Sequence, residues 1–567
     1  MRWTLKPIPD DDKIAKLSKT LGVPEIIARL LVQRGIETFE EAKDFFRPKL
    51  THLHDPFLMK DMEKAVIRIE KAIENQENIL VYGDYDVDGT TSVALVSEFL
   101  ESFYPNVFTY IPDRYSEGYG VSYQGIDFAH DNDFTLIIAL DCGIKAVSQI
   151  AYAARKNIDF IICDHHLPGE EIPQAVAVLD PKQKDCFYPY KELCGCGVGF
   201  KLIQALASRR GLKIDDLLPY LDLVATAIAA DIVPITGENR VLTYYGLQVI
   251  NSKPREGIAA ILKTAKPGET VDVTQVVFGI APRINAAGRM KHGKHAVDLL
   301  RETDSEKAKQ FAEEIEIFNS ERRETDKYIT DEALKQIREN KEENRKTTVV
   351  YHETWHKGVI GIVASRLTET FYRPTLVFTK SGNRLAASAR SVQGFDIYAA
   401  LENCADHIEQ FGGHKYAAGL TLLEENFEHF KAKFEEVVSE LIPSRLLTPE
   451  IEVDSELDFQ QITPRFYRIL KQFAPFGPGN KTPVFMTRNL YDTGYSRCVG
   501  EDKSHLKIDV HQKGTPRFSG IGFGLGAKES IVCSGRPYSA VYCLDENHWN
   551  NKVTLQLRIK DIKEGVL

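Results

Sequence analysis

The sequence contains no apolar run long enough to cross a bilayer, and residues 1–7 lack the basic and apolar order of a signal peptide. Its nine cysteines are scattered, without the spacing of a disulfide framework. Positive charge is not in excess either, since the formal net charge is −10. These absences argue against a membrane-spanning or disulfide-stapled protein and predict a cytoplasmic one. The charge argues only weakly against a nucleic-acid partner, because clustered metal-binding acids inflate the negative count and local basic patches matter more.

The chain is long enough for three or four domains, and its 43% hydrophobic and 27% charged content is ordinary for a globular protein. Residues 1–55 predict a helical lead-in. Short β-type runs alternating with helical stretches predict a mostly parallel α/β domain over 56–302. Residues 303–345 are highly charged, with apolar residues three and four apart and no Pro or Gly, which predicts one long helix. A smaller α/β domain is expected at 346–441. A small β-barrel such as an OB-fold is expected at 446–567, from the β-like runs Ser504–Val510, Ser530–Cys533, Ser539–Tyr542 and Lys552–Ile559.

Acidic residues directly follow apolar, strand-like runs. The residues are Asp84, Asp86 and Asp88 after 79–82, Asp141 after 136–140, Asp164-His165-His166 after 160–163, and Asp231 after the Ala-rich stretch 225–230. Because the carboxyl ends of parallel strands meet at one crevice, these side chains should converge. Like charges this close repel, so a cation must lie among them. Hard divalent ions prefer carboxylates, and Mn²⁺ also accepts imidazole. The pattern predicts a metal site for phosphoryl chemistry.

Two other interpretations explain these acids less well. A single Asp at the end of a strand is usually a helix N-cap or turn residue, but this does not explain three acidic strand ends and a double His. Asp-x-Asp-x-Asp-Gly also begins a calcium-binding EF-hand loop. Position 12 of such a loop, counted from Asp84, is Leu95 rather than Glu, and a strand precedes it, which argues against an EF-hand.

Eight stretches carry a family resemblance: Gly83–Gly89, Leu140–Gly143, Asp164–His166, Asp231–Pro234, Ala281–Arg289, Ser388–Arg390, Gly412–His414 and Pro475–Asn480. In this order they resemble the DHH/DHHA1 phosphoesterases, and within them the bacterial single-strand-specific 5′→3′ DNA exonucleases. The resemblance implies a parallel-sheet DHH domain, joined by the long helix to a smaller α/β DHHA1 domain and followed by the OB-fold.

The resemblance also implies two divalent metal ions, Mn²⁺ first and Mg²⁺ as the alternative. Asp86 and Asp141 would hold one ion, and Asp88, Asp141, His165 and Asp231 the other, so that Asp141 bridges them. Asp84 would ligate a metal or orient a ligand, Asp164 would hold an imidazole, and His166 would face the substrate phosphate. Tyr82 stands where many family members have a ligand His. A neutral phenol is a poor ligand, so the first site is expected to be weaker or to recruit Asp84.

Substrate-binding residues follow from the same resemblance. The expected phosphate-binding set is Arg114, Arg283, Arg289, Ser388, Arg390, Gly412, Gly413 and His414. Arginine offers a planar fork for phosphate, and glycine lets the backbone approach an anion. In the terminal domain aromatic residues alternate with cations, as single strands require, which nominates Tyr467, Tyr491, Arg488 and Arg497. An equally open interpretation is that the aromatic residues belong to the core of the domain and that the charged residues lie on its solvated surface.

The functional hypothesis is a metal-dependent exonuclease that degrades single-stranded DNA 5′→3′ to 5′-mononucleotides, in DNA repair and recombination. Its polarity rests on the resemblance alone. A monomer is expected, with a single-strand-binding protein and a helicase as partners. Two alternatives stay open: a phosphodiesterase for cyclic dinucleotides or short oligonucleotides, and a catalytically inactive DNA-binding scaffold.

Overall fold

The computed structural model describes residues 1–266, 268, 270–549 and 552–565, and the chain divides into two compact units. One unit is Leu50–Thr448. The other combines Met1–Lys49 with Pro449–Leu567. None of the helices described is both long and apolar enough to cross a membrane.

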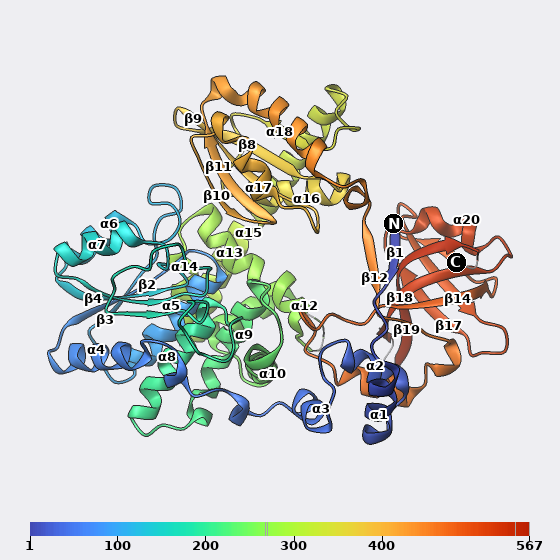
Figure 1. Cartoon of the computed structure of the whole chain (residues 1–567), viewed down its shortest axis with the longest axis horizontal. Coiled ribbons are helices and arrows are strands. Elements are labelled where there is room, and N and C mark those ends of the chain that lie inside the picture. Colours follow the sequence, from blue (N-terminus) through green and yellow to red (C-terminus); the bar gives the residue numbers. More distant parts are fainter. Residues whose placement is uncertain (267, 269, 550–551, 566–567) are drawn as a thin grey trace. The chain divides into compact units, whose positions relative to one another are not determined.

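The larger unit begins with a five-stranded, all-parallel sheet in the order β3-β2-β4-β5-β6 (Figure 1). Alternate strand residues belong to two separate cores, so both faces are buried, as the continuous apolar runs predicted. The strands are β2 (Asn78–Gly83), β3 (Val107–Tyr110), β4 (Phe134–Leu140), β5 (Asp159–Cys163) and β6 (Ala177–Leu179). Helices α4 (Met62–Glu74), α5 (Val87–Glu101) and α8 (Gly195–Arg209) cover one face, and α6 (Tyr123–Asp131) and α7 (Val147–Arg155) the other.

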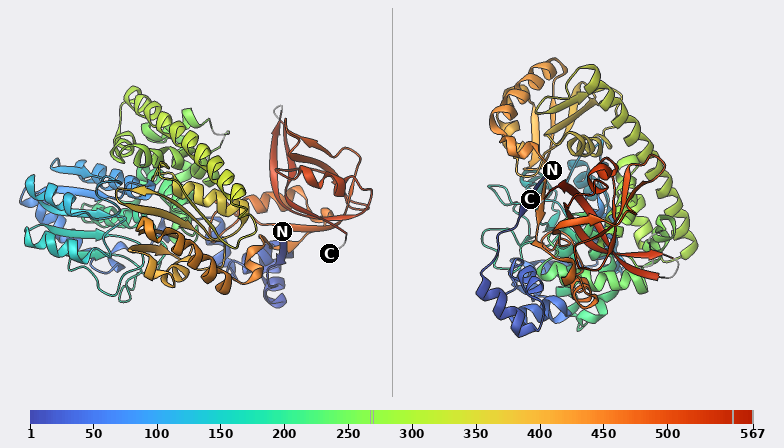
Figure 2. Two further views of the ribbon diagram at one scale, coloured as in Figure 1. Left: turned by 90° about the horizontal axis from the view of Figure 1, so that it is seen from above. Right: turned by 90° about the vertical axis from the view of Figure 1, so that its right-hand side faces the viewer.

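The predicted long helix is confirmed as α15 (Ser305–Glu339), which Figure 2 shows as one continuous rod. The Asp304 side chain caps its first turn. Ala308, Ala312 and Ile315 pack into the core of the first α/β domain. Ile329, Ala333 and Ile337 pack against the second. The preceding helices are α9 (Leu221–Ala230), α10 (Gly237–Ser252), α11 (Glu256–Ala265), α13 (Ala281–Met290) and α14 (Lys294–Arg301).

The second α/β domain is built on a mixed sheet in the order β10-β11-β9-β8-β7, in which only β7 and β8 pair in parallel. Its strands are β7 (Thr348–Tyr351), β8 (Thr375–Ser381), β9 (Arg384–Arg390), β10 (Gln410–His414) and β11 (Ala417–Leu422). Its helices are α16 (Ile360–Phe371), α17 (Ile397–Glu402) and α18 (Phe427–Leu441).

The other unit joins the two ends of the chain. Strand β1 (Arg2–Leu5) pairs in parallel with β12 (Glu450–Val453), and α1 (Asp11–Leu21), α2 (Glu25–Val32) and α3 (Phe39–Phe46) share a core with the terminal β domain. That domain has the strand order β13-β14-β18-β19-β17-β16-β15, with an additional β14–β16 pairing. The β14–β16 pairing joins β14, β18, β19, β17 and β16 into a five-stranded ring of the OB-fold kind, and β13 and β15 flank this ring.

Three of the four strand predictions in this domain are confirmed, in β16 (His505–His511), β18 (Tyr538–Trp549) and β19 (Lys552–Glu564). The fourth, Ser530–Cys533, is wrong, because this segment forms α20 (Glu529–Val532). Val532 is buried and the Glu529 carboxylate accepts a hydrogen bond from the Cys498 N–H at 2.8 Å. A four-residue apolar segment is too short to show a period. The remaining elements are α19 (Pro464–Lys471), β13 (Ser455–Glu456), β14 (Phe485–Asp492), β15 (Arg497–Val499) and β17 (Phe518–Gly522).

Candidate metal centre

Three buried acids stand at the carboxyl ends of neighbouring parallel strands, as the sequence predicted. Asp84 follows β2, Asp141 follows β4, and Asp164 follows β5. The three strands are adjacent and in register, since Gly83 pairs with Leu140 and Leu140 with Cys163. Asp86 lies one turn later, where it caps α5 by accepting a hydrogen bond from the Gly89 N–H at 3.1 Å. The acids therefore gather at one edge of the sheet.

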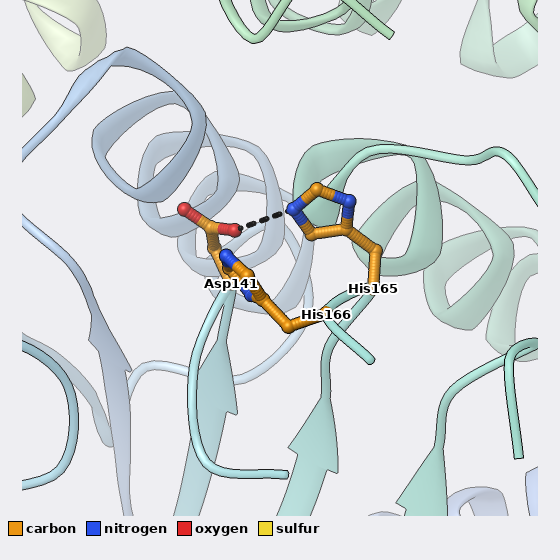
Figure 3. A group of neighbouring side chains, drawn as sticks. All are labelled: Asp141, His165 and His166. Carbon is orange, nitrogen blue, oxygen red and sulfur yellow. Dashed lines mark ion pairs between the residues drawn. The ribbon is translucent and has the colours of Figure 1, made fainter. Parts of the chain in front are cut away.

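His165 is the centre of this group. Its Nε2 lies 3.2 Å from Asp141 Oδ1, the pair that Figure 3 draws. The same nitrogen lies 3.6 Å from Asp231 Oδ2 and 3.7 Å from Asp88 Oδ2. Three carboxylate oxygens and an imidazole nitrogen thus converge from β4, β5, α5 and the end of α9. They are the residues predicted to share the second metal ion, and the geometry is one that could hold a cation.

Unsatisfied buried atoms show that the donor set fits a metal ion. Within the described residues, both carboxylate oxygens of Asp84, Oδ1 of Asp141 and both ring nitrogens of His165 are buried without a hydrogen-bond partner. Leaving such groups unpaired is costly, and a divalent cation would satisfy them together. His165 is suited to the role because burial lowers its pKa to about 3, which keeps the imidazole neutral.

The acids repel one another when no cation lies among them. Burial and the neighbouring Asp86 charge raise the pKa of Asp84 well above its usual value. The same two causes raise the pKa of Asp88 to about 6. Burial and the Asp88 carboxylate raise the pKa of Asp231 to about 9 and that of Asp141 well above the ordinary range. The site therefore holds protons that a metal ion must displace.

The N-terminus of α8 holds two of these acids in place. The backbone N–H groups of Gly195 and Cys196 donate to the Asp88 carboxylate at 2.6 and 2.7 Å. A Cβ on Gly195 would lie 2.5 Å from Asp141 Cβ, so only glycine permits this approach. The sequence analysis missed this role of Gly195, since nothing in the sequence links it to an acid 107 positions away.

Asp164 orients His166, in agreement with its predicted role of holding an imidazole. Its Oδ1 lies 2.7 Å from His166 Nδ1 and accepts the His165 N–H, while its Oδ2 accepts the Ile144 N–H at 2.9 Å. Burial opposes ionisation of Asp164, but the hydrogen bond to His166, the charge of that imidazole and the Ile144 N–H together outweigh burial and lower the pKa of Asp164 to about 2. Burial likewise opposes protonation of His166, but its hydrogen bond to Asp164 and the surrounding carboxylate charges together raise its pKa. The His166 Nε2 lies 3.2 Å from the hydroxyl of Tyr119, a residue that the sequence did not single out.

Tyr82 turns away from this cluster. It is fully buried in the core formed with α6 and α7, and its hydroxyl donates to the Gly120 carbonyl at 2.8 Å. Its ring stacks on Tyr110, with centroids 5.3 Å apart. The phenol is thus an ordinary core group. The weaker first metal site stays a prediction.

A cleft of about 750 Å³ opens beside His166, between the two α/β domains of the larger unit. Tyr119, Lys145 and His166 line one wall, and Lys357 and residues 412–414 the other. The rings of His166 and His414 stack with centroids 6.3 Å apart. Gly413 has φ +145°, and a Cβ there would lie 2.4 Å from the Ala417 carbonyl oxygen. A cleft of this volume lies within the usual range of small-molecule pockets.

A second group of predicted residues forms a cationic cluster. Arg114 stacks on Tyr85 at 4.5 Å, Arg289 donates to the Gly358 carbonyl at 2.9 Å, and Arg390 donates to Ser388 Oγ at 3.1 Å. Burial and the neighbouring guanidinium groups lower the pKa of Arg289 to about 10 and that of Arg390 below its usual value. Buried cations that repel one another are suited to an anionic ligand.

Arg283 lies in a different setting from the other predicted arginines. Its guanidinium forms an ion pair with Glu316 of α15 and donates to the Gly279 carbonyl at 2.7 Å. These contacts give it a structural role, and its contact with phosphate stays a prediction.

The residues nominated in the terminal β domain have partners of their own. Arg488 pairs with Glu456 at 2.6 Å, the Tyr491 ring lies 6.0 Å from the His511 ring, and the Lys471 ammonium lies 5.9 Å from the Tyr467 ring centroid. Arg497 is exposed on β15. Their contact with DNA stays a prediction.

A parallel α/β domain with an acid-and-histidine cluster at its strand ends, facing a second α/β domain through Gly-Gly-His, defines a metal-dependent phosphoesterase of the DHH/DHHA1 class. Family models match accordingly: the DHH family N-terminal domain over residues 78–228, the DHHA1 domain over 344–440 and the RecJ OB domain over 453–561.

Known proteins narrow the class. The single-stranded-DNA-specific exonuclease RecJ of Bacillus subtilis (strain 168) is 38% identical, over 99% of this chain and 70% of the relative. RecJ of Escherichia coli (strain K12) is 34% identical, over 97% of each. The crystal structure of RecJ in complex with Mn²⁺ from Thermus thermophilus superposes with a TM-score of 0.86 at 27% identity, over 100% of this chain and 80% of that one. This chain belongs to the RecJ family of single-stranded-DNA-specific exonucleases, and the predicted resemblance is confirmed.

Proposed function

We propose that this chain is a metal-dependent exonuclease that degrades single-stranded DNA 5′→3′ and releases 5′-mononucleotides. The observation that carries the proposal is the convergence of Asp88, Asp141 and Asp231 on His165 Nε2, within 3.2–3.7 Å. Relatives that align over nearly the whole chain are single-stranded-DNA-specific exonucleases. A role in DNA repair and recombination, and a cytoplasmic location, are part of the proposal.

The proposed cofactor is a pair of divalent ions, with Mn²⁺ preferred over Mg²⁺. RecJ of Thermus thermophilus has been solved with each of these ions. Asp88, His165 and Asp231 would hold one ion, Asp86 the other, and Asp141 would bridge them. Bound ions would supply an activated water and stabilise the negative charge that develops on the phosphodiester.

The chain's own groups would bind and orient the strand. His166 shares its Nδ1 proton with Asp164, so in the imidazolium form its Nε2–H is available to a phosphate oxygen. His414 faces it across the cleft, beside the backbone of Gly412 and Gly413. The cluster of Arg114, Arg289 and Arg390 with Ser388 would hold a further phosphate in bidentate fashion.

The terminal β domain is proposed to guide the strand, with Tyr467 and Tyr491 stacking on bases and Arg488 and Arg497 neutralising phosphates. The match to the RecJ OB domain supports this role. A monomer that works with a single-strand-binding protein and a helicase is the proposed assembly.

One experiment separates the proposal from its alternatives. The chain is incubated with Mn²⁺ and, in separate reactions, 5′-labelled single-stranded DNA, the same strand in a duplex, and a cyclic dinucleotide. Mononucleotides are expected from the single strand alone. Preferential hydrolysis of the cyclic dinucleotide would favour the small-substrate phosphodiesterase, and binding without hydrolysis the inactive scaffold.

A further inference from the structure

Ile232 has a backbone conformation that its side chain disfavours. It directly follows Asp231, which caps the C-terminus of α9, and its φ is +61°. A left-handed residue just past a helix end is usually Gly or Asn, because a Cβ crowds the backbone there. For a β-branched residue this conformation is a true outlier.

Packing in the fold does not explain an isoleucine at this position. The Ile232 side chain is 65% exposed, whereas Val233 and Ile235 on the same segment are buried. Glycine would satisfy the turn without strain, and the exposed side chain gains little from burial. Strained residues that the fold does not need are concentrated at functional sites.

The position of Ile232 beside the metal centre suggests why an isoleucine is found in this strained and exposed position. Asp231 Oδ2 lies 3.6 Å from His165 Nε2, so the residue after Asp231 stands at the rim of the centre. Leu167 follows His165 by two residues and is also 65% exposed. Two exposed aliphatic side chains therefore lie within two residues of groups in the acid cluster.

The chemistry of the substrate identifies what covers Ile232. A phosphodiester at the centre carries a sugar and a base close to the reacting phosphate. An aliphatic side chain has neither a charge nor a hydrogen-bond donor for a phosphate. It does pack against the apolar faces of a sugar and a base, and it excludes water from them. We propose that Ile232 determines specificity by packing against the sugar and base of a nucleotide whose phosphate lies at the metal centre, with Leu167 as a second contact. The inference rests on the proposed exonuclease function.

The test compares Ile232→Gly with the matched control Lys341→Gly. Lys341 is likewise exposed and left-handed, with φ +56°, just past the C-terminus of α15. Both substitutions relieve strain in a left-handed residue, and the relief is larger for the β-branched Ile232, so both variants should unfold at or above the wild-type temperature. Each protein is assayed with Mn²⁺ on an intact single strand. It is also assayed on three further strands, each of which carries a single abasic nucleotide, at the first, second or third position.

Ile232→Gly should raise KM for the intact strand about fivefold to tenfold. It should also lose the wild-type preference for an intact over an abasic nucleotide at one position, whereas Lys341→Gly should match the wild type in both respects. If Ile232→Gly is unstable, Ile232→Asn, which tolerates the left-handed region, replaces it. Unchanged KM and unchanged abasic discrimination, with an active wild type, would overturn the inference alone. A wild type that releases no nucleotide from intact single strands would overturn the proposed function as well.

Discussion

Replacing Gly195 by alanine tests how tightly the N-terminus of α8 supports the metal centre. The added methyl would lie 2.5 Å from Asp141 Cβ, 2.8 Å from its Cα and 2.8 Å from its Oδ1. Asp141 cannot easily give way, because it is left-handed at φ +59° and its N–H donates to the Cys163 carbonyl at 2.9 Å. The helix end and Asp141 must therefore separate.

The separation can be estimated from ordinary contact distances. Carbon atoms pack at about 3.5–4.0 Å, so the two groups must move apart by about 1 Å. Metal sites tolerate about 0.2 Å, and a displacement of about 1 Å in a catalytic constellation costs on the order of 100-fold. The shift would also loosen the two hydrogen bonds that α8 donates to Asp88. Gly195→Ala should lower kcat/KM at least 100-fold, which corresponds to about 2.7 kcal/mol.

The assay is mononucleotide release from a single strand at increasing Mn²⁺, with thermal unfolding measured on the same samples. Gly199→Ala, on the same helix, is the matched control. Its Cβ would meet only side-chain atoms, of Val96 at 3.3 Å and Leu140 at 3.4 Å. It should keep kcat/KM within about threefold and gain helix propensity. A folded Gly195→Ala protein with kcat/KM within tenfold of wild type would refute the reasoning.

Four further predictions concern substrate capture, the terminal domain, metal affinity and Tyr82. His414→Ala should cripple cleavage yet leave Mn²⁺ binding intact, and a metal titration that shows lost ions would contradict this. The fragment Leu50–Thr448 should still cut very short oligonucleotides but bind long strands weakly, with a flatter salt dependence in binding assays. Mn²⁺ affinity should rise between pH 6 and pH 9, because Asp231, whose pKa is raised to about 9, must release its proton, and calorimetry in two buffers measures that release. Tyr82→Phe should destabilise folding by about 1–3 kcal/mol in chemical denaturation, through the orphaned Gly120 carbonyl, with little change in Mn²⁺ dependence.

Those features that depend on local pattern were predictable from the sequence. Asp84, Asp141 and Asp164 each end an apolar run, and parallel strands bring such ends together without further information. The long helix α15 was predictable because its apolar residues keep a helical spacing over a stretch without Pro or Gly.

Features that depend on distant contacts were not predictable from one sequence. Gly195 reads as a helix-start glycine, and only the fold brings its N–H to Asp88. Arg283 has the same local signal as Arg289, but a glutamate on α15 pairs with it. Strand β1 pairs with β12, which lies more than 400 residues later in the chain, and the sequence of neither strand indicates which strand it pairs with. The strain at Ile232 is evident only from its backbone angle φ, which the sequence does not reveal.

The measurement that tests the central claim most directly is the digestion of a 5′-labelled single strand by wild type and by Asp141→Ala, with Mn²⁺ and with a chelator. With Mn²⁺, the wild type should release labelled mononucleotide as the first product, and chelation should abolish this release. Asp141→Ala should be inactive while its thermal unfolding shows a folded protein. Turnover by Asp141→Ala within tenfold of wild type, or undiminished cleavage in the chelator, would contradict a metal-dependent exonuclease built on this acid cluster.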